Sequence, residues 1–360
     1  YFQNLMNEPL INIIGFFTVG ITNNFGYKIM ISAAKDIMKE KAPASIVLLC
    51  NILPSFIIAA IFPSIQHKLK QHWFISIASI SSFIGFILAG LSEINIVFGL
   101  FGVALISLQQ GIGESSMLAY SSLFGNSCLS AWSSGTGLAG VIGSFLYLLL
   151  TQILHIDYQL IIWCFSTIIF VYVVAFFIIK PISENALMYK QDLIIQNLSI
   201  KQRAHVLICE WKIYASLFFT YLFEYSVISG LNALLEYPSN PGQFYTYSQC
   251  SGQLGVFLAR STLQFFKVPF VITNLLFVVE AMLMIFFILE VLFGFVGQFW
   301  VMIILVFVIG FTAGLNYGSA MYWLKQKENN KFLLSAGCMM MNAGIACASG
   351  LGSLFEVILK

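Results

Sequence analysis

Long apolar segments constrain this 360-residue chain more than any other feature of its sequence. Segments of about twenty predominantly apolar residues recur along it, separated by short polar stretches. A helix of that length crosses the roughly 30 Å hydrocarbon core of a bilayer, whereas a transmembrane β-barrel needs alternating segments of about ten residues. With 59% hydrophobic and 9% charged residues, the chain has too few charges to cover a soluble surface. We therefore expect an all-α, polytopic membrane protein.

The apolar segments predict about eleven transmembrane helices. Their expected positions are 11–34, 45–65, 73–92, 95–123, 130–154, 158–180, 212–235, 244–265, 268–292, 297–323 and 333–357. One long polar stretch separates the first six segments from the last five and is typical of a linker. The expected domains are a six-helix bundle over 6–180, a cytosolic linker over 181–210 and a five-helix bundle over 211–360. Residues 1–5 match the remnant of a protease-cleavage tag and are set aside.

Basic residues are distributed unevenly between the two sides of this topology. If the N-terminus is cytosolic, the cytosolic loops hold Lys68, Lys70, Lys180, Lys190, Lys201, Arg203, Lys212, Lys267, Lys325, Lys327 and Lys331, and the other side holds Lys35, Lys39, Lys41 and Lys360. Because cytosolic loops of membrane proteins are enriched in Lys and Arg, this orientation is favoured. The odd number of helices then places the C-terminus on the lumenal or outer side.

Motifs of other protein classes are missing from the sequence. The cysteines lack metal-ligand spacing; they are Cys50, Cys128, Cys164, Cys209, Cys250, Cys338 and Cys347. There is no nucleotide-binding glycine loop and no His-Glu-x-x-His zinc helix, and none of the four histidines lies inside a predicted span. A net charge of +2 gives no support to nucleic-acid binding. We expect no enzymatic activity, no cofactor and no metal site.

Five charged residues lie inside the predicted spans and give the strongest indication of a functional site. They are Lys28, Glu114, Glu224, Arg260 and Glu280. A charged side chain at the centre of a membrane helix costs about 2.5–3.5 kcal/mol on insertion scales, so such residues usually mark a binding site or pathway. The role of Glu280 stays open.

Polar residues concentrate in the first, fourth, seventh and tenth predicted spans. These spans are equivalent in a bundle of three-helix repeats, and polar residues at equivalent positions predict a central cavity between two halves. Their spacing agrees, because Asn24, Lys28 and Ser32 recur every four residues, as do Gln110 and Glu114. For the amides and hydroxyls, the alternative is hydrogen bonding that only holds the bundle together.

Several short motifs resemble the battenin family over nearly the whole chain. They are Thr22-Asn23-Asn24-Phe25-Gly26-Tyr27, Asn51-Ile52-Leu53-Pro54, Gly111-Ile112-Gly113-Glu114, Trp132-Ser133-Ser134-Gly135-Thr136-Gly137, Phe223-Glu224-Tyr225 and Gly255-Val256-Phe257-Leu258-Ala259-Arg260-Ser261. The Trp-Ser-Ser-Gly-Thr-Gly run is the most specific of them. The sequence departs from the family pattern at Lys28, where an apolar residue is usual, and at Asn51 and Asn342, where Asp is common.

The resemblance implies a major-facilitator-like fold in a late endosomal, lysosomal or vacuolar membrane. It also implies a role in lumenal pH balance and in the export of glycerophosphodiesters, which are small anions. The extra cation at Lys28 and the two missing carboxylates can shift the choice of substrate. The expected partners are therefore a small anionic solute, the lipid bilayer and protons, with no nucleic acid, and the identity of any protein partner stays open.

Alternating access about the central cavity is the expected mechanism. Arg260 and Lys28 would bind a phosphodiester, amides would bind glycerol hydroxyls, and aromatic rings would face a choline group. The expected cargo-binding residues are Asn23, Asn24, Tyr27, Lys28, Gln110, Trp132, Tyr225, Asn232 and Arg260. Glu114 and Glu224 are expected to carry protons, or to form gating ion pairs with Lys28 or Arg260.

Two other functions remain open at the level of the sequence. One is transport of a different cargo, such as a basic amino acid or a nucleoside. The other is a non-transporting regulator of vacuolar pH and trafficking, for which the segment 181–210 would be the partner surface.

Overall fold

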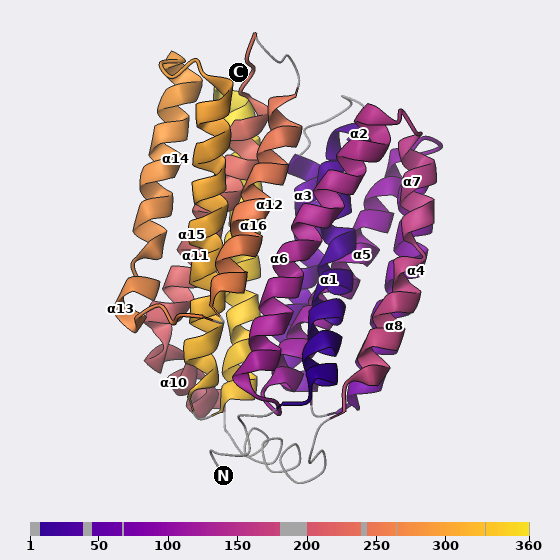
Figure 1. The fold of residues 1–360 in the computed structure, drawn as a ribbon, viewed down its shortest axis with the longest axis vertical. Coiled ribbons are helices and arrows are strands. Elements are labelled where there is room, and N and C mark those ends of the chain that lie inside the picture. Colours follow the sequence, from indigo (N-terminus) through magenta and orange to yellow (C-terminus); the bar gives the residue numbers. More distant parts are fainter. Residues whose placement is uncertain are drawn as a thin grey trace.

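The protein is a bundle of helices that run along its long axis (Figure 1), and the described residues contain no strand. The computed structural model describes residues 8–38, 45–66, 68–180, 200–238, 243–263, 265–327 and 329–359. The helices are α1 (Leu10–Ser32), α2 (Ala34–Met38), α3 (Ser45–Ile65), α4 (Gln71–Gly90), α5 (Ile96–Ser121), α6 (Asn126–Leu148), η2 (Leu149–Ile153), α7 (Tyr158–Phe165), α8 (Ile168–Ile178), α10 (Ile200–Cys209), α11 (Trp211–Tyr225), η3 (Ser226–Gly230), η4 (Leu231–Ala233), α12 (Phe244–Thr262), α13 (Phe270–Thr273), α14 (Leu276–Phe293), α15 (Phe299–Lys325) and α16 (Asn330–Ile358). The predicted all-α fold is confirmed.

Seven helical segments among the described residues are long and apolar enough to cross a membrane. They are Gln71–Gly90, Ile96–Ser121, Asn126–Thr151, Tyr158–Ile178, Phe270–Phe293, Phe299–Lys325 and Phe332–Ile358. The other predicted spans correspond to α1, α3, α11 with η3, and α12, which lie alongside the seven in the same bundle (Figure 1). Polar residues such as Lys28 and Arg260 lower the apolar character of α1 and α12. The apolar stretch of α3, Ile46–Phe62, and the 15-residue α11 are shorter than the seven segments.

The outer surface of the bundle is apolar. Ile80 of α4, Phe170 of α8 and Met282 of α14 expose 62%, 68% and 58% of their surface. Apolar side chains exposed at this density would be unfavourable in water, but they match the hydrocarbon of a bilayer. The exposure pattern therefore agrees with a polytopic membrane protein.

The helices pack in two groups. In the first group, α1 packs on α6 and α8, and α5 packs on α3 and α4; in the second, α12 packs on α15, and α11 on α14 and α16. Each group has an apolar cluster of its own, built around Phe25, Phe86 and Ile106 in the first and around Phe244 and Phe299 in the second. The groups meet where α6 packs on α12 and α3 packs on α16.

Some of the predicted domain boundaries fall outside the residues that the structure describes. The tag remnant, 1–5, lies outside the described residues, as does 181–199 of the predicted linker. The rest of that linker differs from a purely irregular connection, because Ile200–Cys209 forms the helix α10 and leads directly into α11. The boundaries 6–180 and 211–360 stay a prediction.

Glycines allow helices within each group to approach closely. A Cβ atom at Gly135 of α6 would collide with the backbone carbonyl of Phe17 in α1. In the second group, a Cβ atom at Gly310 of α15 would collide with the backbone of Gly252 in α12. Small residues at membrane helix interfaces permit such contacts because they bring the two backbones into van der Waals range. These two pairs fix the spacing of the helices that carry the polar residues.

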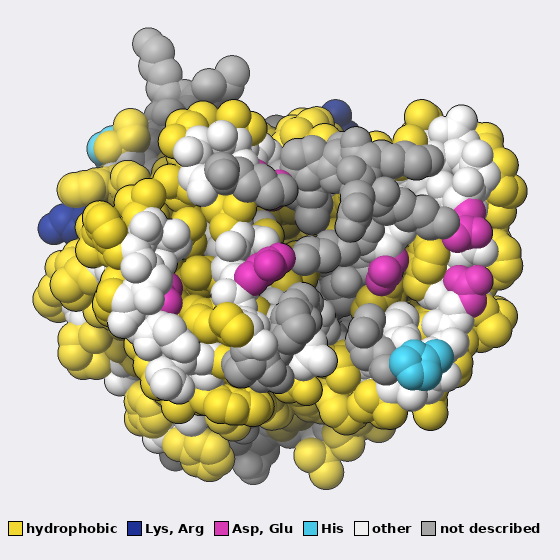
Figure 2. Space-filling view, turned by 90° about the horizontal axis from the view of Figure 1, so that it is seen from above, with side chains coloured by type: hydrophobic (Ala, Val, Ile, Leu, Met, Phe, Trp, Pro, Cys, Tyr) yellow, Lys and Arg dark blue, Asp and Glu magenta, His cyan; other side chains and the backbone are white. Residues whose placement is uncertain are grey.

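The two ends of the bundle differ in charge. At the end where α1 begins, which we call the basic end, the exposed residues include Lys68, Lys70, Lys180, Lys212, Lys267 and Lys327. The opposite end, the acidic end, exposes Glu93, Asp157 and Glu236. Figure 2 shows the acidic end from above, with acidic side chains spread across it and a histidine near its edge.

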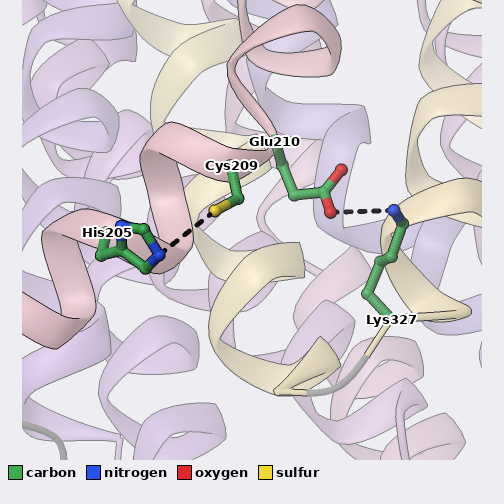
Figure 3. A network of polar contacts seen from close by, with 4 residues as sticks. All are labelled: His205, Cys209, Glu210 and Lys327. Atoms are coloured by element: carbon green, nitrogen blue, oxygen red, sulfur yellow. Dashed lines mark hydrogen bonds and ion pairs between the residues drawn. The ribbon is translucent and has the colours of Figure 1, made fainter.

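At the basic end, α10 and the α15–α16 connection are held together by an ion pair. Lys327 Nζ lies 2.9 Å from Glu210 Oε1, and the nearby Cys209 Sγ lies 3.7 Å from His205 Nε2 one helical turn earlier (Figure 3). The Lys327 side chain is 41% exposed, so water screens this pair and its contribution to stability is small. None of these four residues lines the polar cavity at the centre of the bundle.

Candidate functional site

A small polar cavity lies between the two helix groups. It is lined by Asn24, Tyr27, Lys28, Ile52, Gln110, Glu114, Thr136, Tyr221, Tyr225, Gln253, Val256, Arg260, Met341 and Ile345. These residues come from α1, α3, α5, α6, α11, α12 and α16, so both groups contribute. A central cavity between the two groups is therefore present, but its walls differ from the prediction. The first, fourth and seventh predicted spans, which correspond to α1, α5 and α11, line it. The tenth, α15, has no described residue in the lining, and α3, α6, α12 and α16 line it instead. The volume of the cavity is about 30 Å³, which is too small for a solute larger than water in this conformation.

Arg260 of α12 connects the two groups. Its Nη1 donates a hydrogen bond to Thr136 Oγ1 of α6 at 2.6 Å, and its Nη2 donates to the Tyr221 hydroxyl of α11 at 2.8 Å. The guanidinium carbon lies 4.0 Å from the centre of the Tyr317 ring in α15. Stacking on a ring suits the planar guanidinium group, and no carboxylate among the described residues pairs directly with this cation.

Glu114 of α5 is linked to the same arrangement through Tyr317. The Tyr317 hydroxyl donates to Glu114 Oε1 at 2.9 Å, and Gln110 Nε2 donates to Glu114 Oε2 at 2.6 Å. Both oxygens of this buried carboxyl group therefore have partners, as burial of a polar group in a low-dielectric interior requires. Tyr317 thus lies between the cation of one group and the carboxyl of the other.

Lys28 of α1 is the second cation of the site and is partly buried. Its Nζ donates to the Tyr225 hydroxyl of α11 at 3.2 Å and lies 5.2 Å and 5.6 Å from the ring centres of Tyr27 and Tyr225. Glu224, the neighbour of Tyr225, is 2% exposed, and its Oε2 atom has no hydrogen-bond partner among the described residues. Two cations and two carboxyl groups therefore occupy the centre of the bundle, so their charges can balance.

Hydrogen bonds between polar side chains cross the interface of the groups at several points. Besides the contacts of Arg260, Lys28 and Tyr317, Ser134 Oγ lies 2.7 Å from Ser261 Oγ, and Asn342 Nδ2 donates to Ser55 Oγ at 2.9 Å. These contacts hold the two groups together on both sides of the cavity. Because each bond joins side chains of different groups, relative movement of the groups would break them.

The predicted cargo-binding residues fall into two sets. The residues that line the cavity are Asn24, Tyr27, Lys28, Gln110, Tyr225 and Arg260, together with the predicted proton carrier Glu114. Asn23 does not line it, because its side chain accepts hydrogen bonds from Gln109 Nε2 at 2.8 Å and from the Tyr172 hydroxyl at 3.3 Å inside the first group. Trp132 is fully buried in the apolar core, and Asn232 is fully buried in η4. Binding roles for these three residues find no support in the cavity lining.

Four polar residues of this arrangement were not among the predicted site residues: Thr136, Tyr221, Gln253 and Tyr317. Tyr221 and Tyr317 lie in spans that are rich in polar residues, and Thr136 belongs to the Trp-Ser-Ser-Gly-Thr-Gly run. Their place beside Arg260 depends on tertiary packing, because α6, α11, α12 and α15 are far apart in the sequence. The predicted carboxyl Glu280 lies outside the cavity, where it is fully buried and accepts a hydrogen bond from Thr312 Oγ1.

No group of three or more His, Cys, Asp or Glu side chains that could hold a metal ion occurs in the described part of the chain. The cavity wall instead offers two cations, a carboxyl group, amides and phenol hydroxyls, with the carboxyl of Glu224 beside it. Such a set can bind a charged, hydroxylated solute and can exchange protons. It contains no paired nucleophile and base of the kind that hydrolytic enzymes use.

Comparison with known proteins identifies the family. Residues 14–207 and 199–360 match the sequence profile described as CLN3 protein. Protein BTN1 of Kluyveromyces lactis is 32% identical over 265 residues, which cover 68% of this chain and 67% of that protein. Battenin of the dog, Canis lupus familiaris, is 25% identical over 403 residues, which cover 95% of this chain and 90% of that protein.

Solved structures of major facilitator superfamily transporters share the fold. FucP, a transporter of this superfamily captured in the outward conformation, superimposes with a TM-score of 0.56 at 17% identity, covering 97% of this chain and 96% of that chain. A second structure, of the E. coli fucose:proton symporter FucP, gives a TM-score of 0.54 at 13% identity. At this level of identity the likeness concerns the fold alone. Because the family profile matches residues 14–207 and 199–360 of this chain, the chain belongs to the battenin family, the one described as CLN3 protein.

Proposed function

We propose that this protein is an alternating-access transporter that exports small anionic solutes, such as glycerophosphodiesters, from the lumen of a lysosome or vacuole to the cytosol. Membership of the battenin family and the fold shared with major facilitator transporters support transport rather than enzymatic catalysis. The exposed lysines that the described residues place at the basic end support a cytosolic location for that end, because cytosolic loops are enriched in Lys and Arg.

The observation that carries the proposal is the environment of Arg260. Its Nη1 and Nη2 atoms are held by Thr136 and Tyr221, which orient the guanidinium plane, while its buried Nε has no hydrogen-bond partner among the described residues. A guanidinium group held in this way presents donors in a fixed plane, which suits the two free oxygens of a phosphodiester. Cargo binding would also compete with the hydrogen bond from Arg260 to Thr136, and so weaken the contact between the two helix groups.

Other lining residues suit the rest of a glycerophosphodiester. Lys28 supplies a second positive charge, and Gln110 Oε1 and Gln253 Oε1 are buried acceptors without partners in the described part of the chain. Glycerol hydroxyls could donate to these amide oxygens and so satisfy groups that are otherwise costly to bury. A solute with a single negative charge and several hydroxyls therefore matches the available groups.

We further propose that transport is coupled to proton movement through a buried carboxyl group. Glu114 shares its oxygens between Tyr317 and Gln110, whereas Glu224 keeps one oxygen without a partner among the described residues. Glu224 therefore has a free position for a proton, and its neighbour in the chain, Tyr225, accepts a hydrogen bond from Lys28 Nζ. Uptake or release of that proton would change the charge balance of the cavity, and could link the lumenal pH to cargo export.

Metabolite profiling of membrane vesicles tests this function without assuming a cargo. Vesicles with the wild-type protein should differ from vesicles with the Arg260→Ala variant in their content of glycerophosphodiesters after loading with a mixed metabolite extract. Preferential movement of a basic amino acid or a nucleoside would instead identify a different cargo. Equal metabolite contents in both kinds of vesicle would contradict a transport role for Arg260.

A further inference from the structure

A second and larger pocket lies toward the basic end, one helical turn away from the central cavity. Its volume is about 350 Å³, and it is lined by Ile13, Asn126, Ser127, Leu129, Ser130, Ser133, Leu263, Lys267, Val268, Gly318, Ser319, Met321 and Tyr322. The lining comes from both helix groups, mainly from the start of α6 and the ends of α12 and α15. Hydroxyl and amide groups make part of its wall polar, although its surroundings are the apolar ends of membrane helices.

Two serine hydroxyls in this pocket have no hydrogen-bond partner among the described residues. Ser133 and Ser319 are 3% and 2% exposed, and the Oγ atom of each is buried and unpaired. A buried hydroxyl without a partner costs about 1–3 kcal/mol, so a partner from a bound solute would be favourable. The two serines lie on α6 and α15, so one solute could contact both helix groups.

One cation among the described residues, Lys267, lines the same pocket. Lys267 is exposed, with its Nζ 4.9 Å from the centre of the Tyr322 ring, and both residues line the pocket. Asn126 and Ser127, which also line it, form the first turn of α6, where backbone N–H groups lack helical partners and where no acidic residue occurs. Lys325 Nζ donates to the Gly125 carbonyl at 2.9 Å, next to this turn, and Glu8 Oε1 accepts from Gly125 N on the other side of the same residue.

The pocket and the central cavity are separate spaces whose linings lie one helical turn apart along α6. Thr136 and Arg260 line the cavity, whereas Ser133 and Leu263, each three residues away along the chain, line the pocket. Ser134 and Ser261, whose hydroxyl oxygens lie 2.7 Å apart, fall between these positions in the sequence, and the Arg260–Thr136 hydrogen bond lies at the wall of the cavity. A solute that leaves Arg260 toward the basic end would therefore enter this pocket once those contacts open.

We propose that the pocket between α6, α12 and α15 is a second binding site for the transported anion, occupied before release to the cytosol. Its ligand is a soluble, hydroxylated phosphodiester: Lys267 and the first turn of α6 face the phosphoryl group, and Ser133 and Ser319 bond to the hydroxyls. This inference rests on the proposed function for the identity of the cargo, but binding at the pocket can be measured without transport.

Equilibrium binding of radiolabelled glycerophosphoglycerol to the full chain in phosphatidylcholine nanodiscs tests the second site. The Arg260→Ala variant removes the central site and should keep saturable binding at the pocket. Adding Lys267→Met should weaken that residual binding about tenfold, equivalent to about 1.4 kcal/mol. Ser133→Ala in the same background should weaken it as well, and as a small replacement it leaves the packing of α6 unchanged. Lys212→Met, which removes an exposed lysine of the basic end outside the pocket, should leave binding unaltered.

Three results would overturn the second site. The first is complete loss of saturable binding in Arg260→Ala protein that keeps the wild-type melting temperature. The second is residual binding that neither Lys267→Met nor Ser133→Ala weakens. The third is displacement by lysophosphatidylglycerol with no binding of the soluble probe, which would make the pocket a lipid site. Binding that follows the expected pattern in protein without any uptake would instead support the pocket and contradict the transport function.

Discussion

The hydroxyl of Tyr317 donates a 2.9 Å hydrogen bond to Glu114 Oε1, and so joins a helix of the second group to a helix of the first at the centre of the bundle. The ring of the same tyrosine lies 4.0 Å from the guanidinium carbon of Arg260. One side chain therefore contacts both a buried cation and a buried carboxyl group. A change in the charge of Arg260 or Glu114 therefore alters the electrostatic environment of the other group through their shared contact with this tyrosine.

The Tyr317→Phe substitution separates these two contacts, because it removes the hydroxyl and keeps the ring beside Arg260. We expect the free energy of unfolding to fall by about 1–3 kcal/mol, since Glu114 loses a donor in a buried environment. Thermal unfolding of the purified variant in detergent measures this loss. Tyr247→Phe is the matched control, because Tyr247 is 38% exposed at the outer surface and should tolerate the change. Equal stability of the two variants would contradict the role given to the hydroxyl.

Close approach of α12 and α15 makes Gly310 sensitive to added volume. In Gly310→Ala, the new Cβ atom would collide with the Gly252 backbone, and we expect a loss of stability of about 1–3 kcal/mol. Gly350→Ala adds the same methyl group at a position with no atom within 4 Å and should leave stability unchanged. Melting curves of both variants under identical conditions compare them directly. A Gly310→Ala protein as stable as the Gly350→Ala protein would show that the two helices separate more easily than the packing indicates.

Glu224 should carry the pH dependence of transport. In Glu224→Gln the side chain cannot bind or release a proton, so net uptake driven by a pH gradient should fall to the rate seen without a gradient. Exchange of labelled for unlabelled cargo at equal concentrations should continue, because exchange needs no net proton movement. Reconstituted vesicles allow both assays on one preparation. Loss of exchange together with net uptake would favour a gating or structural contact with Lys28 over proton coupling.

The distribution of lysines predicts which end of the bundle faces the cytosol. An N-glycosylation acceptor fused after Lys360 should be modified in cells, because an odd number of spans places the C-terminus in the lumen. The natural Asn197-Leu198-Ser199 sequence should stay unmodified on the cytosolic side. A mobility shift that glycosidase treatment reverses reports each modification. Modification of Asn197 in the natural sequence would reverse the orientation and with it the direction assigned to transport.

Helix positions and the buried charges could be predicted from the sequence. An apolar segment of twenty residues is long enough to span a bilayer, and a charge inside such a segment is too costly to be common without a function. Of the five charged residues predicted inside the spans, Lys28, Glu114 and Arg260 line the cavity, whereas Glu224 and Glu280 do not. The binding and proton-carrying roles given to them stay predictions. The sequence could not show which of the two adjacent residues Asn23 and Asn24 faces the cavity, because both are asparagines in the same polar span. The two are neighbours and differ by about 100° around the helix, so only one of them faces the cavity.

The side chains that contact Arg260 could not be predicted from sequence patterns, for a different reason. Thr136, Tyr221 and Tyr317 are neutral residues of kinds that are common in membrane helices, where they usually hydrogen-bond between helices. Their importance follows from α6, α11 and α15 converging on one guanidinium group. The 350 Å³ pocket likewise depends on the separation of helix ends, which apolar periodicity leaves undetermined.

Uptake of labelled glycerophosphocholine by proteoliposomes with wild-type, Arg260→Lys or Arg260→Ala protein tests the central claim most directly. We expect saturable uptake by the wild type, at least a roughly tenfold lower rate for Arg260→Ala, and an intermediate rate for Arg260→Lys, which keeps the charge and loses the planar donors. Melting temperatures confirm that all three proteins are folded. Uptake at the wild-type rate by folded Arg260→Ala protein would contradict the account of this site.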